Sequence, residues 1–259
     1  KNAAAAQVLL EMGANVSARS DGGMTAVLFA ARAGHINTVS TLLKGGANLD
    51  ETADDAIPRA PQKTDDDSEK HAANIEPEPL GLGSSVLATA IRNTHYDLAA
   101  WLVSEGADIN ADGPRGTALH GLIRARNCEL TAMPCPEQKA QMGSLALAEM
   151  LLAHDADVNA RMSARPPTKG TYDGNSMSLV GATPLFLAVK AADLPMTHLL
   201  LRNGADPTIG NEDDTIPLLV AAGMGFIAGQ VAASEAGALE TVKLLVDLGE
   251  EVTFKNNND

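Results

Sequence analysis

The chain has 259 residues, of which 45% are hydrophobic and only 3% are aromatic, so its core must be built from small aliphatic side chains. A formal net charge of -14 and a pI near 4.7 argue against a nucleic acid partner, because binding a phosphate backbone requires a clustered basic face. The uncharged stretch 216–233 is rich in Ala and Gly and contains Pro217, so it does not predict membrane insertion.

A short motif recurs along the chain and predicts a repeat protein. Its six copies are LLEMGANVSA (9–18), LLKGGANLDE (42–51), LVSEGADINA (102–111), LLAHDADVNA (151–160), LLRNGADPTI (200–209) and the degenerate LVDLGEEVTF (245–254). Five of them follow a second motif: MTAVLFAARAGH (24–35), SSVLATAIRNTH (84–95), GTALHGLIRARN (116–127), ATPLFLAVKAAD (182–193) and TIPLLVAAGMG (215–225). Each copy predicts a pair of short helices. Because no pair can bury its apolar face alone, the copies must stack into a solenoid.

The copy at residues 21–50 shows how one pair is built. Thr25 is predicted to cap the first helix by offering its hydroxyl to free backbone N–H groups. Val39 and Leu42 recur at helical spacing and predict the apolar stripe of the second helix. Gly46 then predicts the left-handed backbone conformation that ends this helix.

These motifs resemble the ankyrin repeat, whose signature runs T-P-L-H-x-A-A, then G-H, then L-L, then G-A-D-V-N over about 33 residues. The resemblance implies an all-α fold, an ankyrin-repeat solenoid of stacked helix-turn-helix units with finger hairpins and long loop insertions. We expect residues 1–259 to form one such solenoid of about five to six repeats, the first partial, in a parent polypeptide that continues at least at the C-terminus. Leu28 and Phe186 replace the signature histidine, and Asp155 stands where the helix-ending glycine belongs.

Four insertions interrupt the pattern, near residues 51–83, 127–143, 161–181 and 226–238. The first contains nine acidic residues, three basic residues and four prolines, and such a composition cannot bury a core of its own. Loops added at helix junctions project outward and cost little entropy, so we expect the stacked core to be intact.

The only two cysteines, Cys128 and Cys135, both lie in the second insertion. Two cysteines in one polar loop are an oxidation liability unless they pair, so their placement favours a disulfide and an oxidising compartment such as a periplasm. Two unpaired thiols in a reducing cytoplasm are the alternative. A zinc site would need about four ligands and only His120 lies close in sequence, so no metal site is predicted.

The other polar residues predict no catalytic centre and no cofactor. His35 and His95 share one repeat position and His120 lies in the signature TALH, where the resemblance implies hydrogen bonds to neighbouring backbone. The run that starts at Asp108 imitates a calcium-binding loop but has Leu119 in place of the bidentate glutamate. The sequence contains no phosphate-binding glycine loop and no nucleophile motif, so we predict no enzymatic activity.

Four basic residues occupy one position at the end of the first helix in successive copies: Arg32, Arg92, Arg124 and Lys190. Stacking should align this basic ladder on the concave face, where it is suited to an acidic partner surface. A basic residue is also common at this ankyrin position, so a purely structural explanation stays open. We predict these partner-binding residues: Met24, Arg32, Arg92, Asn93, Arg115, Arg124 and Lys190.

The resemblance implies a noncatalytic protein–protein interaction module, because the concave face of ankyrin repeats usually binds a protein. A similarity to bacterial ankyrin proteins with long insertions, some of them exported, favours a periplasmic subunit of a larger hetero-complex, beside a redox enzyme. The alternatives are an enzyme or ligand-binding module with a pocket formed by the insertions, and a cytosolic adaptor.

Overall fold

The computed structural model describes residues 3–53, 83–113, 116–127, 141–164, 177–223 and 235–248. Within these ranges the chain is all-helical, and its β-type pairings are isolated bridges. The helices are α1 (Ala3–Glu11), α2 (Ala26–Arg32), α3 (Ile36–Lys44), α4 (Val86–Arg92), α5 (Tyr96–Ser104), α6 (Ala118–Arg126), α7 (Ser144–Ala153), α8 (Pro184–Lys190), α9 (Leu194–Arg202), α10 (Pro217–Ala221) and α11 (Glu235–Asp247).

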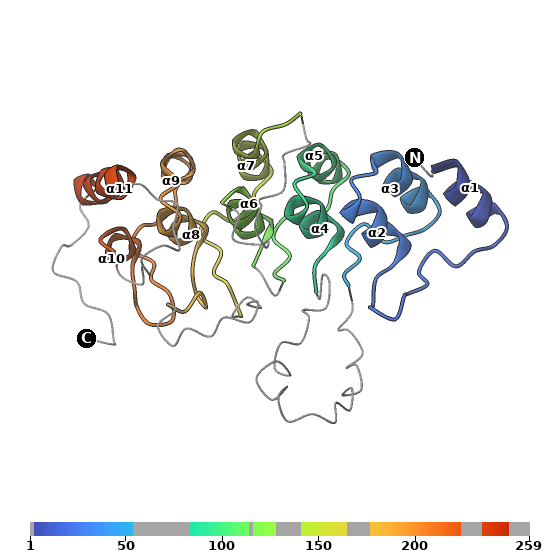
Figure 1. The fold of residues 1–259 in the computed structure, drawn as a ribbon, viewed down its shortest axis with the longest axis horizontal. Coiled ribbons are helices and arrows are strands. Elements are labelled where there is room, and N and C mark those ends of the chain that lie inside the picture. Colours follow the sequence, from blue (N-terminus) through green and yellow to red (C-terminus); the bar gives the residue numbers. More distant parts are fainter. Residues whose placement is uncertain are drawn as a thin grey trace, which may run out of the picture.

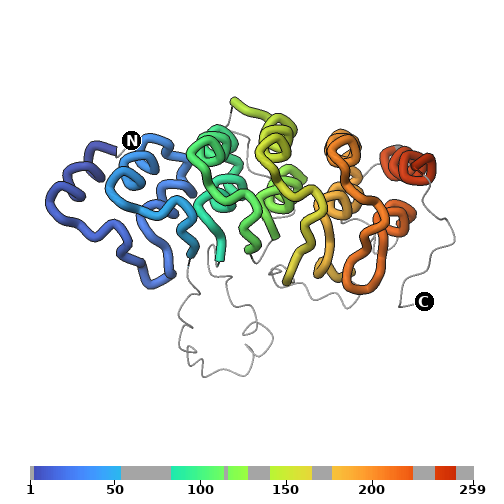
Figure 2. The backbone as a smooth tube through the Cα atoms, turned by 180° about the vertical axis from the view of Figure 1, so that it is seen from behind, coloured from blue at the N-terminus to red at the C-terminus, as the bar shows by residue number. Residues whose placement is uncertain are grey.

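The helices form two layers (Figure 1). The first helices α2, α4, α6, α8 and α10 make one row, in which each helix packs against the next. The second helices α3, α5, α7, α9 and α11 make the other row, and each packs on the first helix of its own repeat. The described chain runs from one end of this stack to the other without returning (Figure 2). The predicted solenoid of helix pairs is therefore confirmed.

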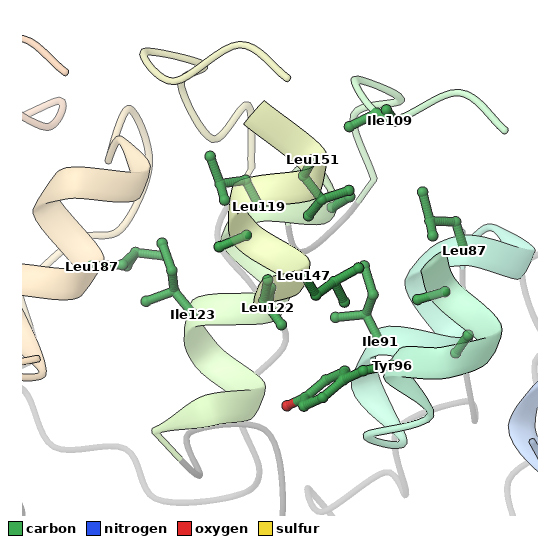
Figure 3. Close-up of a cluster of buried hydrophobic side chains, with 14 of the residues drawn as sticks. Leu87, Ile91, Tyr96, Ile109, Leu119, Leu122, Ile123, Leu147, Leu151 and Leu187 are labelled. Carbon is green, nitrogen blue, oxygen red and sulfur yellow. The ribbon is translucent and has the colours of Figure 1, made fainter. Parts of the chain in front are cut away.

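Small aliphatic side chains fill the space between the layers, as the composition predicted. Ala31, Ala90 and Ala188 are fully buried in the first helices α2, α4 and α8, where the short side chain allows a neighbouring helix to approach closely. Branched side chains of α4, α6 and α7 converge in the same core (Figure 3). Those labelled in that view include Leu87, Ile91, Leu119, Leu122, Ile123, Leu147 and Leu151.

Helix starts follow the predicted chemistry in some repeats only. The hydroxyls of Ser85 and Thr183 accept hydrogen bonds from the backbone N–H groups of Ala88 (3.1 Å) and Phe186 (3.2 Å). Thr25 is the N-cap residue of α2, but its buried hydroxyl has no hydrogen-bond partner among the described residues. The prediction that Thr25 caps through its side chain is wrong, because this buried hydroxyl accepts no hydrogen bond from the first turn of α2.

Side-chain hydrogen bonds join the turns that follow the second helices. We call Asp50, Asn110 and Asn159 the turn ladder. In each case the side-chain Oδ1 accepts a hydrogen bond of 2.8 Å from a backbone N–H of the next repeat, donated by Asp108, Asp157 and Asp206 respectively. Asp108 and Asn110, the first two residues that imitate calcium ligands, are engaged in these turns. The ladder fixes the spacing of successive repeats at their exposed edge.

Backbone hydrogen bonds join the described residues on the two sides of the first and third insertions. Gly83 donates its N–H to the carbonyl of Ala53 at 2.9 Å, so the two described residues that flank the first insertion lie together. Gly181 likewise donates to Met162 at 2.7 Å on the two sides of residues 165–176. The core therefore continues past both insertions. At the fourth, α11 already begins at Glu235, before the predicted boundary at 238.

Candidate functional site

The structure places the basic ladder in the last turns of four neighbouring first helices, α2, α4, α6 and α8. A cation in the last turn of a helix is stabilised by the negative end of the helix dipole, so part of this pattern has a structural cause. Exposure differs along the ladder. Arg32 is exposed, Arg92 and Lys190 are half-buried, and Arg124 is only 5% exposed.

Arg32 also differs from the rest of the ladder in its interactions. Arg92, Arg124 and Lys190 each interact with another group of the protein. The Arg32 guanidinium makes no hydrogen bond or ion pair with any described residue, although its backbone carbonyl accepts a hydrogen bond from the imidazole of His95 at 3.0 Å. Among the described residues, Arg32 at the N-terminal end of the ladder is therefore the ladder cation whose side chain makes no such interaction.

Phe29, which the sequence reasoning did not select, lies three residues before Arg32 on α2 with 48% of its surface exposed. Its counterparts in the aligned motifs include Thr89, which is 5% exposed, and Leu187, which is fully buried. Because repeat position alone does not distinguish these environments, the sequence carried no signal for an exposed aromatic side chain here. Phe29 and Arg32 together form what we call the α2 face.

The other predicted partner-binding residues do not contribute equally. Met24 is 5% exposed, so its side chain offers little surface. Asn93 is half-buried and follows α4, where its Nδ2 donates to the carbonyl of Thr89 at 2.8 Å. Arg115 lies outside the described residues.

Two histidines hydrogen-bond to neighbouring backbone, as the family resemblance implied. His95 Nε2 donates to Arg32 of the preceding repeat, and His120 Nε2 donates to the carbonyl of Ala182 in the next repeat at 3.1 Å. His120 Nδ1 accepts from the backbone N–H of Thr117 at 3.2 Å. Burial lowers the pKa of His120 to about 4, so the ring is neutral at pH 7 and links two repeats.

Carboxylates of the flanking repeats hold both ends of the second insertion. On one side, the Asp193 carboxylate accepts hydrogen bonds from Arg126 Nε at 2.5 Å and from Asn127 Nδ2 at 3.2 Å. On the other, the Asp97 carboxylate accepts from the backbone N–H groups of Gln141 (2.9 Å) and Met142 (3.0 Å). The two ends are therefore fixed to different neighbours, on α5 and beside α9.

The predicted disulfide between Cys128 and Cys135 lies outside the described residues. Within the part that the structure describes, no group of three or more His, Cys, Asp or Glu side chains is placed to hold a metal ion. No helix in the same ranges combines the length and the apolar character of a membrane span.

Comparisons with known proteins agree with this geometry. A family model described as three copies of the ankyrin repeat matches residues 1–113, and a single-repeat model matches residues 180–212, which together exceed half of the chain. Among solved structures, the ankyrin repeat domain of Bcl-3, described as a unique member of the IkappaB protein family, is 20% identical with a TM-score of 0.55. That match covers 93% of this chain and 77% of the other.

No curated protein matches the chain. The likeness to the Bcl-3 domain concerns the fold alone, whereas the family models match the repeat motifs themselves. The structure adds three features to those motifs: two layers of stacked helix pairs, histidine hydrogen bonds between repeats, and hydrogen bonds between successive turns. The chain therefore belongs to the ankyrin repeat family.

Proposed function

We propose that this chain is a noncatalytic protein-binding module, a scaffold or subunit of a larger hetero-complex, which holds a protein partner on its concave face with help from its insertions. Ankyrin repeats generally mediate protein–protein interaction, and the family is typically non-catalytic. The observation that carries the proposal is the alignment of Arg32 and Arg92 at the same ends of the adjacent helices α2 and α4.

Alignment matters because binding energy at protein interfaces concentrates in a few clustered side chains, among which arginine is enriched. Two arginines on neighbouring rigid helices form a patch whose spacing the packed core fixes. A loop would have to lose conformational entropy to achieve the same geometry. Arg124 is only 5% exposed and separates Lys190, which is half-buried like Arg92, from the two arginines, so the adjacent pair Arg32 and Arg92 is the proposed contact region.

The second insertion supports a further part of the proposal. Its ends are anchored through Asp97 and Asp193, so any cross-link between Cys128 and Cys135 would act on a loop whose base is already fixed. We place such a disulfide in an oxidising compartment, in a bacterial periplasmic assembly that includes a redox enzyme. Free thiols would instead favour a cytosolic adaptor.

The test is to extract the native protein from its source without reductant, measure the mass of its assembly, and identify crosslinked peptides. Crosslinks from α2 and α4 to another protein in a discrete larger complex support the proposal. A monomer with alkylatable Cys128 and Cys135 contradicts the periplasmic subunit.

Recombinant variants then locate the contact region. Reversing both charges, Arg32→Glu with Arg92→Glu, should abolish capture of the identified partner. Arg202→Glu is the matched control, because Arg202 is an exposed cation in the last turn of α9, in the other helix layer. Equal capture by both variants would remove the first-helix face from the proposal.

A further inference from the structure

The repeat that carries the second insertion is assembled differently from its neighbours. In three other repeats the paired helices are separated by three residues only: 33–35 between α2 and α3, 93–95 between α4 and α5, and 191–193 between α8 and α9. Residues 127–143 separate α6 from α7. A connection of that length does not by itself fix one helix against the other, so other contacts must hold α7 in place.

Side chains of neighbouring helices supply these contacts. Arg126, in the last turn of α6, donates from Nη1 to the hydroxyl of Ser144, the first residue of α7, at 2.7 Å. The same guanidinium donates to the Asp193 carboxylate at the start of α9. Asp97 of α5 accepts hydrogen bonds from the backbone of the two residues that precede Gly143, the N-cap residue of α7. We call Asp97, Arg126, Ser144 and Asp193 the α7 latch.

The start of α7 depends on the latch because this helix lacks a side-chain cap. A glycine stands at its N-cap position and offers no side-chain acceptor to the backbone N–H groups of the first turn. By contrast, Ser85 caps α4, Thr183 caps α8 and Asp193 caps α9. Contacts from outside the helix therefore matter more for α7 than for these three.

The remainder of the stack does not need α7 in order to stay packed. The first helices α4, α6 and α8 pack against one another, α5 packs on α4, and α9 packs on α8. All of these contacts would remain if α7 moved away. The fully buried side chains of Leu147, Ala148 and Leu151 would then reach water, so the open state is the minor one.

One buried group gains from such an opening. The Tyr96 hydroxyl is fully buried and makes no hydrogen bond with any described residue. Tyr96 begins α5, which packs against α7, and its side chain lies in the same buried cluster as Leu147 (Figure 3). A buried polar group without a partner is costly, and water would satisfy it once α7 had left. This cost narrows the free-energy difference between the closed and the open state.

We infer that the α7 latch is a conformational device, which holds α7 on the stack and whose release lets α7 open as a unit while the neighbouring helices stay packed. The hydrogen bonds that Asp97 and Arg126 make to the start of α7 set how often this helix opens. A ligand that engaged either side chain in place of these bonds would release α7. The inference does not depend on the proposed binding face and stands even if that face binds nothing.

The test is hydrogen exchange with mass spectrometry on the whole chain, repeated at low urea concentrations. In the wild type, α7 should exchange through an opening that costs less free energy and depends less on urea than the opening that exposes α4 and α6. The variant Asp97→Ala with Ser144→Ala removes the bonds to the start of α7 but keeps the pair of Arg126 and Asp193. It should accelerate exchange in α7 about tenfold, with α4 and α9 unchanged.

Two control variants separate the latch from general effects. Glu149→Ala changes an exposed residue in the middle of α7, and Asp50→Ala removes a carboxylate-to-backbone hydrogen bond between two other repeats. Both should exchange α7 as the wild type does. Circular dichroism and the fluorescence of Trp101, the only tryptophan, verify folding. If the double variant does not fold, Ser144→Ala alone takes its place and should accelerate exchange in α7 about threefold.

Three results would overturn the inference. If α7 of the wild type exchanges only together with α4 and α6, at one shared opening free energy, it has no separate open state. If the substitutions accelerate exchange equally in every helix, the latch contributes to overall stability alone. If they leave exchange in α7 unchanged, Asp97 and Arg126 do not hold this helix.

Discussion

At the scale of single residues, Asp155 shows how the repeat signature constrains the backbone. The glycines Gly13, Gly46, Gly106 and Gly204 end second helices with φ between +86° and +96°. Asp155 stands at the same position and adopts φ +63°. A residue with a Cβ atom is strained in this conformation, although Asp tolerates it better than most.

Replacing Asp155 with glycine should therefore stabilise the protein by about 0.5–1 kcal/mol, because glycine has no Cβ atom to strain this left-handed conformation. The side chain of Asp155 is exposed, and the hydrogen bond that its carbonyl accepts from Asn110 is retained. The measurement is equilibrium urea unfolding followed by Trp101 fluorescence. As a control, Ala153→Gly in the last turn of α7 should cost about 1 kcal/mol. A loss of stability in Asp155→Gly would contradict the prediction.

His120 makes stability depend on pH in a defined window. The ring titrates near its ordinary pKa of about 6.5 in the unfolded chain, but the folded-state pKa is about 4. The unfolded state therefore binds more protons between these values, so stability is complete above pH 6.5 and decreases as the pH falls to 4. The loss from this group is about 3 kcal/mol, from 1.36 kcal/mol for each pKa unit.

The measurement is the free energy of unfolding of the wild type and of His120→Gln at pH 8, 6.5, 5 and 4. The variant should be less stable at pH 8, because it loses the bonds to Thr117 and Ala182, and it should lose less stability than the wild type on acidification. Parallel curves would show that His120 does not cause the dependence. Carboxylates shared by both proteins cancel in the comparison.

At the scale of elements, the turn ladder joins the turn of each repeat to the turn of the next by side-chain hydrogen bonds. Asn159 makes two such bonds, accepting from the backbone N–H of Asp206 at 2.8 Å and donating to the carbonyl of Gly204 at 3.1 Å. Asp50 occupies the equivalent position and can only accept. Asn159 therefore makes one more hydrogen bond to the next repeat than Asp50 does.

Asn159→Ala should destabilise the protein by about 1–2 kcal/mol, since two hydrogen bonds of roughly 0.5–1.5 kcal/mol each are lost at a partly exposed site. Asn159→Asp retains the acceptor and should cost about half as much. Thermal and urea unfolding of the three proteins measure the difference. If the aspartate variant is as unstable as the alanine variant, the acceptor bond to Asp206 makes no net contribution.

At the scale of the whole molecule, the main packing contacts between the described helices join neighbouring repeats, so damage should stay local. Gly34 provides the test. A Cβ atom there would lie 2.5 Å from Nδ1 of His95 in the next repeat, with φ at +71°. Gly46 also has a positive φ, +96°, but nothing lies within 4 Å of its position. A Cβ atom would therefore be strained at both glycines, but only at Gly34 would it also collide with a side chain of the next repeat.

Gly34→Ala should therefore reduce amide-exchange protection in α2 through α5 while leaving α8 and α9 unchanged, as measured by hydrogen exchange with mass spectrometry. Gly46→Ala should cost only the backbone strain, about 1 kcal/mol. Uniform loss of protection along the stack in Gly34→Ala would show that the solenoid unfolds as one unit, contrary to the expected local response.

The repeat signature predicted the solenoid and its helix pairs because helix ends and apolar stripes depend on residues that are close in the sequence. Gly46 was assigned its left-handed conformation from one position, and Val39 and Leu42 were assigned to the core from their helical spacing; the structure confirms these assignments. The capping role of Thr25 was predicted wrongly, since a threonine at the N-cap position does not determine where its hydroxyl points once the side chain is buried.

What the sequence by itself determined was the fold and the register of the repeats, including the alignment of Arg32 with Arg92, Arg124 and Lys190. Only the tertiary structure decided which of them face solvent, because exposure depends on how neighbouring helices and turns cover each position. For the same reason Phe29 is open and its counterpart Leu187 is buried, although both stand at one place in the motif. The local sequence determines where a residue stands in the motif, whereas packing between repeats determines how much of its side chain is exposed.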